Sequence, residues 1–176
     1  MGLHPFRRKE TPVSEEEKLK ITTKDLALTA VYAALYAALV YVAIPLAFGV
    51  AQVRFAGVLR PAIAKKWILA VGYAVGVLIA NFISPFAGPW DLIFMPLVSF
   101  LAGLAGYLVA KPFKGNFFVS GGVTAVIIAI SLSYMFEQFG MGSMFVTLPY
   151  LFVVEQTLCL VGASIFTLIN RRYHTW

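Results

Sequence analysis

The sequence predicts an all-α membrane protein, a bundle of six transmembrane helices with both termini on the cytoplasmic side. Hydrophobic residues make up 60% of the 176 residues and charged residues only 12%, which is about half the charged share of a soluble domain. The mean hydropathy is +0.84. Several apolar runs also approach the roughly 20 residues that a helix needs to cross about 30 Å of hydrocarbon. We therefore expect a multi-pass protein of the cell membrane.

The chain divides into three parts by charge. Residues 1–25 hold six Lys or Arg and five Asp or Glu and form a charged cytoplasmic segment. The apolar run that follows continues to Leu46 without a small-residue cleavage site, so we interpret it as a retained helix rather than a secretory signal. Residues 26–170 form the transmembrane domain, and residues 171–176 form a short basic tail.

Five apolar runs are long enough to cross the membrane. Pro45 ends the first run and Pro85 follows the second, since proline interrupts helical hydrogen bonding. Lys111 and Pro112 stop the third. The runs comprise residues 26–46, 67–84, 91–110, 117–136 and 145–169.

Loop charge predicts a sixth crossing at residues 50–64. This stretch contains Arg54 and Arg60, so it suits a short, bent helix that its neighbours shield from lipid. If it crosses, the 85–90 and 138–144 loops, which have no basic residue, share one side. The basic loops then share the other side, as is typical of the cytoplasmic face. Arg60, nearer the basic loop, is expected to be an interfacial anchor whose head group reaches water.

Polar residues in the predicted spans gather in the half of the membrane away from the cytoplasm. Ionisable groups within a span are costly and are functional candidates by default. One of these groups, Glu155, lies about ten residues into the last helix, roughly 15 Å deep in the membrane. The distribution indicates a pocket that opens to the outside and contains three carboxylates, one guanidinium and one amide. These candidates are Arg54, Asn81, Asp91, Glu137 and Glu155.

Each candidate also has a purely structural explanation. Asp91 suits the positive end of a helix dipole, Glu137 suits the water interface, and Asn81 can bridge two helices by hydrogen bonding. Arg54 can pair with one of the acids. Glu155 in the middle of a span needs either a partner or a ligand, so it is the strongest candidate.

The first predicted helix carries a stripe of small residues. Small residues four positions apart let helices approach closely in lipid. The stripe can pack within the chain, as Gly72 and Gly76 can, or it can face a partner protein. It consists of Ala30, Ala33, Ala34, Ala37 and Ala38.

Several classes of function lack their motifs. The sequence has no G-x-x-x-x-G-K-[ST] phosphate loop, no G-x-S-x-G and no H-E-x-x-H. A single cysteine, Cys159, and two histidines argue against a metal cluster. Too few charges remain outside the N-terminal segment for nucleic-acid binding. We expect no cofactor, no metal and no catalysis.

The order of motifs resembles a known transporter family. QVRF at residues 52–55, LIANF at 78–82 and PWDLIF at 89–94 follow the alanine-striped helix. This arrangement is similar to the QueT family, the substrate-binding (S) components of energy-coupling factor (ECF) transporters associated with queuosine precursors. The resemblance covers residues 26–169 and is strongest over 50–110. Glu155 stands where the family usually has a glutamate in its last helix.

The resemblance implies a six-helix S component that captures a vitamin-like 7-deazaguanine outside the cell. It also implies two kinds of partner, namely a membrane coupling subunit facing the alanine stripe and two separate ATPase subunits that supply energy. The residues implied in substrate binding are Gln52, Arg54, Asn81, Asp91, Glu137 and Glu155.

The sequence departs from the family pattern at one place. The family commonly has Ser-Glu-Ala-Leu after its Q-x-R motif, whereas this chain reads Ala56-Gly57-Val58-Leu59. The replacement of a polar pair concerns the ligand more than the transporter class. Two alternatives therefore stay open, namely an S component for a different small nutrient and a small membrane scaffold that transports nothing.

Overall fold

The computed structural model describes residues 21–48 and 53–173, and throughout this part the regular structure is helical. Five α-helices of more than ten residues alternate with shorter helices and turns. The elements are α1 (Thr23–Val42), α2 (Ile44–Ala47), the 3-10 helix η2 (Phe55–Lys65), α3 (Leu69–Asn81), the π-helix η3 (Trp90–Phe94), α4 (Met95–Ala110), the 3-10 turn η4 (Lys111–Phe113), α5 (Phe117–Gln138) and α6 (Met144–Tyr173).

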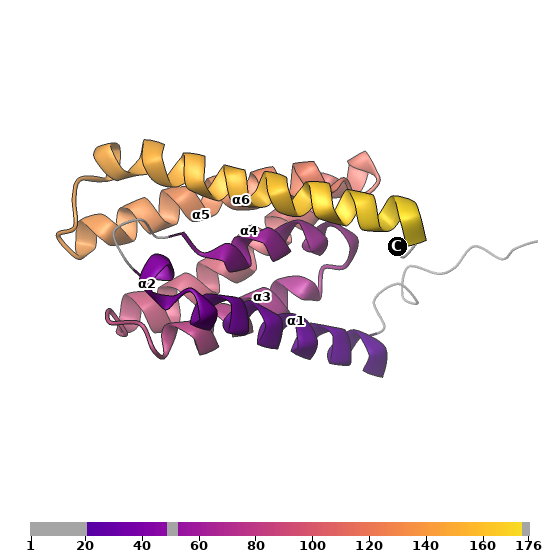
Figure 1. Cartoon of the computed structure of the whole chain (residues 1–176), viewed down its shortest axis with the longest axis horizontal. Coiled ribbons are helices and arrows are strands. Elements are labelled where there is room, and N and C mark those ends of the chain that lie inside the picture. The colour runs from indigo at the N-terminus through magenta and orange to yellow at the C-terminus, as the bar shows by residue number, and fades with distance from the viewer. Residues whose placement is uncertain (1–20, 49–52, 174–176) are drawn as a thin grey trace, which may run out of the picture.

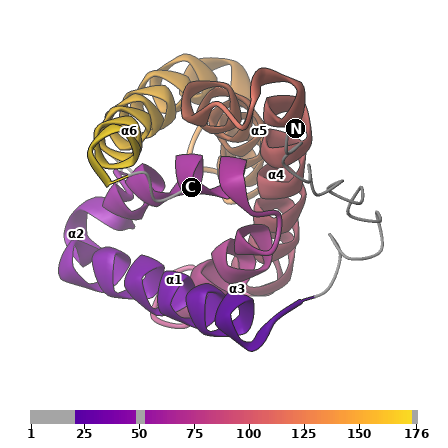
Figure 2. The ribbon, with the colours of Figure 1, turned by 90° about the vertical axis from the view of Figure 1, so that its right-hand side faces the viewer.

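The long helices lie side by side along the longest axis of the molecule (Figure 1). Viewed down that axis, α1 and α3 form one side and α4, α5 and α6 close the other, with η2 between them (Figure 2). η2 contacts all five of these helices. The predicted short helix between the first two apolar runs is therefore present, and its neighbours enclose it.

Four helical segments in the described part are long and apolar enough to cross a membrane, namely Thr23–Val42, Trp90–Phe113, Phe117–Gln138 and Met144–Tyr173. α3 is apolar but has only 13 residues, about 20 Å of helix. A turn at Trp67 precedes α3, and Pro85 follows it without an N–H to continue the helix, so α3 is shorter than the predicted run 67–84. The prediction of an all-α membrane protein is confirmed at this level.

The ends of α1 follow from its local sequence. Thr22 and Asp25 form a capping box, which satisfies free N–H groups of the first turn. The helix consequently begins at Thr23, earlier than the predicted residue 26. Pro45 cannot donate a backbone hydrogen bond, so α1 ends at Val42, and Pro45 lies in the first turn of α2.

Proline also shapes the entrance to α4, which was predicted as one continuous helix from residue 91. The N–H of Met95 bonds to the carbonyl of Trp90 in a π-type turn, and the next residue, Pro96, has no N–H to give. The carbonyl of Asp91 is thereby left without a partner from its own helix. This local irregularity positions one of the candidate site residues.

The alanine stripe of α1 divides between two faces. Ala33 and Ala37 are buried on the side that packs against α3. A side chain at Gly76 would lie 3.0 Å from the Ala33 carbonyl oxygen, so the glycine permits the close approach of the two helices. The other row of the stripe is exposed and consists of Ala30, Ala34 and Ala38.

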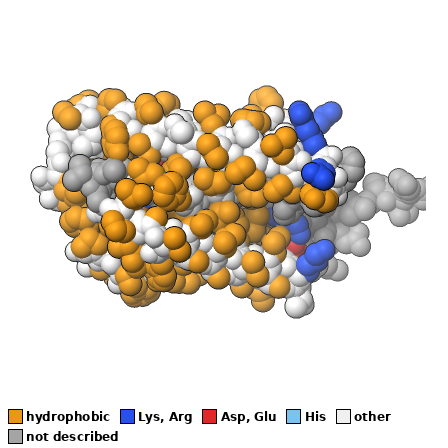
Figure 3. Space-filling model, viewed as in Figure 1, with side chains coloured by type: hydrophobic (Ala, Val, Ile, Leu, Met, Phe, Trp, Pro, Cys, Tyr) orange, Lys and Arg blue, Asp and Glu red, His pale blue; other side chains and the backbone are white. Residues whose placement is uncertain are grey.

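Charge is confined to one end of the visible surface. In Figure 3 the Lys and Arg side chains lie at the end where α1 begins and α6 finishes, while the sides are largely hydrophobic. Lys66 forms an ion pair with Asp25, and Lys65 donates a hydrogen bond to the Lys114 carbonyl at 3.2 Å. We call this region the basic end.

Candidate functional site

A buried ion pair joins Arg60 of η2 to Glu155 of α6 at the centre of the bundle. The two side chains are 1% and 0% exposed. The pair forms because η2 packs against α6, which brings both side chains into the interior. Our expectation that Arg60 is an interfacial anchor is therefore wrong, since enclosed η2 gives the guanidinium no route to the interface.

Three tyrosines from the other side of the bundle surround this pair. The Arg60 guanidinium lies 5.4 Å from the centre of the Tyr73 ring on α3, a cation–π distance. The Tyr73 and Tyr36 ring centres are 5.2 Å apart, and buried Tyr32 lies one turn from Tyr36 on the same face of α1. We call Tyr32, Tyr36, Arg60, Tyr73 and Glu155 the central cluster.

Several polar atoms of the central cluster have no hydrogen-bond partner among the described residues. They are the hydroxyls of Tyr32 and Tyr36, the Nε atom of Arg60 and the Oε1 atom of Glu155. Leaving a buried donor or acceptor unpaired costs about 1–3 kcal/mol, and nearly all such groups in folded proteins are paired. The four unpaired atoms around one ion pair can be satisfied by a polar ligand or by buried water.

A second group of polar side chains lies where α3 ends and η3 begins. The Asn81 Nδ2 atom donates a hydrogen bond of 2.8 Å to the Asp91 carbonyl, the carbonyl that Pro96 leaves free. The Ser84 hydroxyl lies close to the Asp91 carboxylate, and the Arg54 guanidinium is near it without forming an ion pair. We call Arg54, Asn81, Ser84 and Asp91 the Asn81–Asp91 cluster.

The Asn81–Asp91 cluster also keeps unpaired atoms. Asn81 and Asp91 are 0% and 1% exposed, yet neither Asn81 Oδ1 nor Asp91 Oδ1 has a hydrogen-bond partner in the described part of the chain. The Arg54 guanidinium lies 5.2 Å from the Phe48 ring centre. The cluster thus offers two acceptors, one of them anionic, beside an aromatic ring and a cation.

η2 connects the two clusters. Arg54 precedes its first turn and Arg60 lies in its middle. Arg54 is six residues before Arg60 and has an extended backbone just outside the helix. This short segment thus presents one guanidinium to each cluster.

The structure sorts the sequence-predicted site residues into three groups. Arg54, Asn81 and Asp91 come together, and Glu155 lies in the central cluster. Glu137 is exposed near the end of α5 and belongs to neither cluster. Gln52 lies outside the described residues.

Sequence reasoning missed the tyrosines of the central cluster. Tyr32 and Tyr36 are four residues apart, hence on one face of α1, and that face also carries buried Thr29. Hydroxyl groups that repeat along one face of a membrane helix could have predicted a polar site on that face. The described residues contain no group of three or more His, Cys, Asp or Glu side chains placed to hold a metal ion.

Comparison with known proteins decides the family. The family model of the QueT transporter matches residues 26–171, which is most of the chain. The chain belongs to the QueT transporter family. No curated protein and no solved structure matches it significantly. Membership in QueT identifies a membrane-embedded transport protein, the S component of an ECF-type transporter, and confirms the resemblance seen in the sequence.

Proposed function

We propose that this QueT protein captures a queuosine precursor of the 7-deazaguanine class outside the cell and passes it to a coupling subunit. Two separate ATPase subunits supply the energy. The observation that carries the proposal is the set of unpaired polar atoms in the central cluster, on residues that are at most 7% exposed. A bound polar solute supplies the partners that the protein itself leaves out.

The chemistry of a 7-deazaguanine suits the groups present. Its guanidine-like edge donates hydrogen bonds, which Glu155 Oε1 accepts, and its exocyclic carbonyl oxygen accepts from the hydroxyls of Tyr32 or Tyr36. The tyrosine rings provide flat apolar surface for the bicyclic base. A cationic aminomethyl arm pairs with the Asp91 carboxylate in the second cluster.

The same proposal includes the orientation in the membrane. The chain crosses the cell membrane six times, with η2 and α3 as the short crossings and both termini in the cytoplasm. The support is the distribution of charge, because the basic end has the excess of Lys and Arg that is typical of cytoplasmic loops. The exposed row Ala30, Ala34 and Ala38 is the surface we assign to the coupling subunit, since the other alanines are used within the chain.

One observation favours a different small nutrient as the second candidate. Gly57 stands where the family commonly has glutamate, and a Cβ atom there would lie 3.4 Å from the Arg60 guanidinium carbon and 3.3 Å from Leu158. The chain therefore lacks a carboxylate beside Arg60 that the family pattern would provide. A ligand without a guanidine-like edge would be consistent with that loss.

A thermal-shift screen of the detergent-solubilised protein tests the proposal. We expect 7-aminomethyl-7-deazaguanine to raise the unfolding midpoint, with 7-deazaguanine as the matched compound that lacks only the aminomethyl arm. A ligand at 100 times its dissociation constant adds about 2.7 kcal/mol of stability. For a chain of this size that corresponds to roughly 5–10 °C.

The other outcomes of the screen are equally clear. A shift with thiamine or riboflavin, and none with deazaguanines, would assign the protein to another nutrient. Absence of any shift, together with native mass spectra that show no retained small molecule, would contradict solute capture and favour the scaffold alternative.

A further inference from the structure

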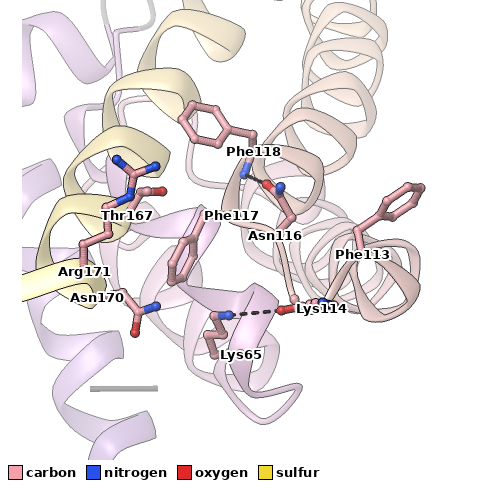
Figure 4. Close-up of a pocket in the computed structure, with 10 residues that line it drawn as sticks. Lys65, Phe113, Lys114, Asn116, Phe117, Phe118, Thr167, Asn170 and Arg171 are labelled. Atoms are coloured by element: carbon pink, nitrogen blue, oxygen red, sulfur yellow. Dashed lines mark hydrogen bonds between the residues drawn. The ribbon is translucent and has the colours of Figure 1, made fainter. Parts of the chain in front are cut away.

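A cavity opens at the basic end, away from both polar clusters. It lies between the end of η2, the turn before α5 and the last turns of α6, and its volume is about 340 Å³. In Figure 4, Thr167, Asn170 and Arg171 of α6 lie on one side, and Asn116, which precedes α5, lies on the other side with Phe118 of α5. Lys65 and Phe117 lie between them.

The cavity has a strongly positive lining. Lys65, Lys114 and Arg171 all border it, and none of the ten described residues that line it is acidic. The nearby Lys66 is by contrast neutralised by Asp25. Among the residues that the structure describes, no carboxylate in the lining neutralises the positive charge of the cavity.

The local backbone holds the two lysines together. Lys114 and Gly115 have φ angles of +58° and +65°, a left-handed turn that glycine adopts easily. A side chain at Gly115 would lie 2.9 Å from the Ala64 carbonyl oxygen. The turn thus packs tightly on the end of η2, and the Lys65 ammonium lies 4.9 Å from the Phe117 ring centre.

The rim of the cavity is apolar. Phe113 and Phe118 line it and are 58% and 43% exposed. Exposed aromatic rings beside cations, at the end of a bundle whose sides are hydrophobic (Figure 3), lie where acyl chains meet head groups in a bilayer. A free anion would make no favourable contact with these aromatic rings.

We propose that this cavity binds the phosphate head group of an anionic phospholipid of the cytoplasmic leaflet. Lys65, Lys114 and Arg171 contact the phosphate, and Phe113 and Phe118 contact the acyl chains. Basic pockets between helices on this side of a membrane are suited to anionic lipids. The proposal needs the basic end to lie at the membrane surface, but it does not depend on which solute the central cluster takes.

Native mass spectrometry of delipidated protein titrated with phosphatidylglycerol tests this. We expect the parent to bind phosphatidylglycerol more tightly than phosphatidylcholine. The triple variant Lys65→Gln, Lys114→Gln, Arg171→Gln should lose at least about tenfold in affinity for phosphatidylglycerol, because each cation near the phosphate contributes separately. A charge-retaining variant, Lys65→Arg, Lys114→Arg, Arg171→Lys, should bind nearly as well as the parent.

The matched control removes three other cations of the basic end that do not line the cavity. Lys24→Gln, Lys111→Gln, Arg172→Gln changes the net charge equally and should keep the affinity within about twofold of the parent. An equal loss in this control would show general attraction rather than a site and would overturn the proposal. An unchanged midpoint without lipid shows that each variant is folded.

Two further results would also overturn the proposal. If inorganic phosphate at millimolar concentration displaced the lipid fully, the ligand of the cavity would be a free anion. If the triple Gln variant bound phosphatidylglycerol like the parent but no longer co-purified with the coupling subunit, the cavity would be a contact site for that subunit. Solute binding by the same variants reports separately on the proposed function, so failure of one does not imply failure of the other.

Discussion

The ion pair between Arg60 and Glu155 sets the chemistry at the centre of the bundle. Removing two charges from water is expensive, and their attraction repays that cost only when the geometry is good and the remaining atoms are hydrogen-bonded. Here Glu155 Oε1 lacks a partner in the described structure. Our proposal assigns this unpaired oxygen to the bound solute.

Neutralising one member of the pair should destabilise the protein strongly. Glu155→Gln or Arg60→Met leaves one uncompensated buried charge, which costs about 3–5 kcal/mol. The double variant removes both charges and should be close to the parent in stability while losing solute binding. The free energy of unfolding, measured by chemical denaturation in micelles, gives the comparison.

The chain contains its own control for this cycle. Lys66 and Asp25 form the other ion pair found in the described residues, and their side chains are 36% and 17% exposed. Such a pair contributes at most about 1 kcal/mol, so Lys66→Met and Asp25→Asn should have small effects. If the Arg60 and Glu155 variants were as mild as these, the central cluster would have no special role.

At this scale the sequence revealed Glu155 and missed Arg60. A carboxylate in the middle of an apolar run is conspicuous by itself, because lipid offers it no partner. The direction in which Arg60 points depends on which helices enclose η2, and no property of residues 50–64 alone determines that. The tyrosines were missed because their rings fit an apolar pattern, while their hydroxyls become important only through packing.

Among the elements, η2 is the one on which the others depend. It is an 11-residue 3-10 helix, and its Arg60, Ala62 and Ile63 are almost fully buried. Runs of 3-10 helix this long are uncommon because their hydrogen bonds are poorer. Packing against five helices holds it, and the closest approach is where α6 passes over Val58.

Gly162 of α6 makes that approach possible. A Cβ atom at this position would overlap the Val58 carbonyl oxygen, so Gly162→Ala should push α6 away from η2. Overpacking of this kind costs about 1–3 kcal/mol or more, and a fall in the unfolding midpoint measures it. Weaker solute binding should accompany it, because Glu155 lies two turns away on α6.

Gly122 of α5 is the matched control. The nearest atom to a Cβ there is Gln156 Oε1 at 3.9 Å, so Gly122→Ala adds a methyl group without a clash. It should leave the midpoint unchanged or raise it, since alanine favours a helix by up to about 1 kcal/mol over glycine. Equal destabilisation by both substitutions would refute the close contact between α6 and η2.

The sequence predicted the long helices well and the irregular ones poorly. α5 and α6 begin at Phe117 and Met144, each within one residue of the prediction, because their apolar runs are unbroken. The π-turn at Trp90 was not foreseen. This turn depends on two residues. Pro96 has no N–H to donate to the Asp91 carbonyl, and the Asn81 side chain of α3 donates to that carbonyl instead. Pro96 is close to the turn in sequence, whereas Asn81 belongs to the preceding helix.

At the scale of the whole molecule, the two ends of the bundle differ in charge. The basic end carries Lys65, Lys66 and Lys114 close together, and α1 begins and α6 ends there (Figure 1). The 85–90 and 138–144 loops contain no basic residue. We propose that these loops lie outside the cell, so that a solute reaches the buried polar atoms from that side.

Labelling of single introduced cysteines in intact cells tests this central claim most directly. The native Cys159 is buried and should not react with a membrane-impermeant maleimide. Ala87→Cys and Ser143→Cys, both at exposed positions, should label in intact cells. Lys111→Cys and Arg172→Cys, exposed at the basic end, should label only after permeabilisation. The reverse pattern would place the loops at residues 87 and 143 in the cytoplasm and contradict capture from outside.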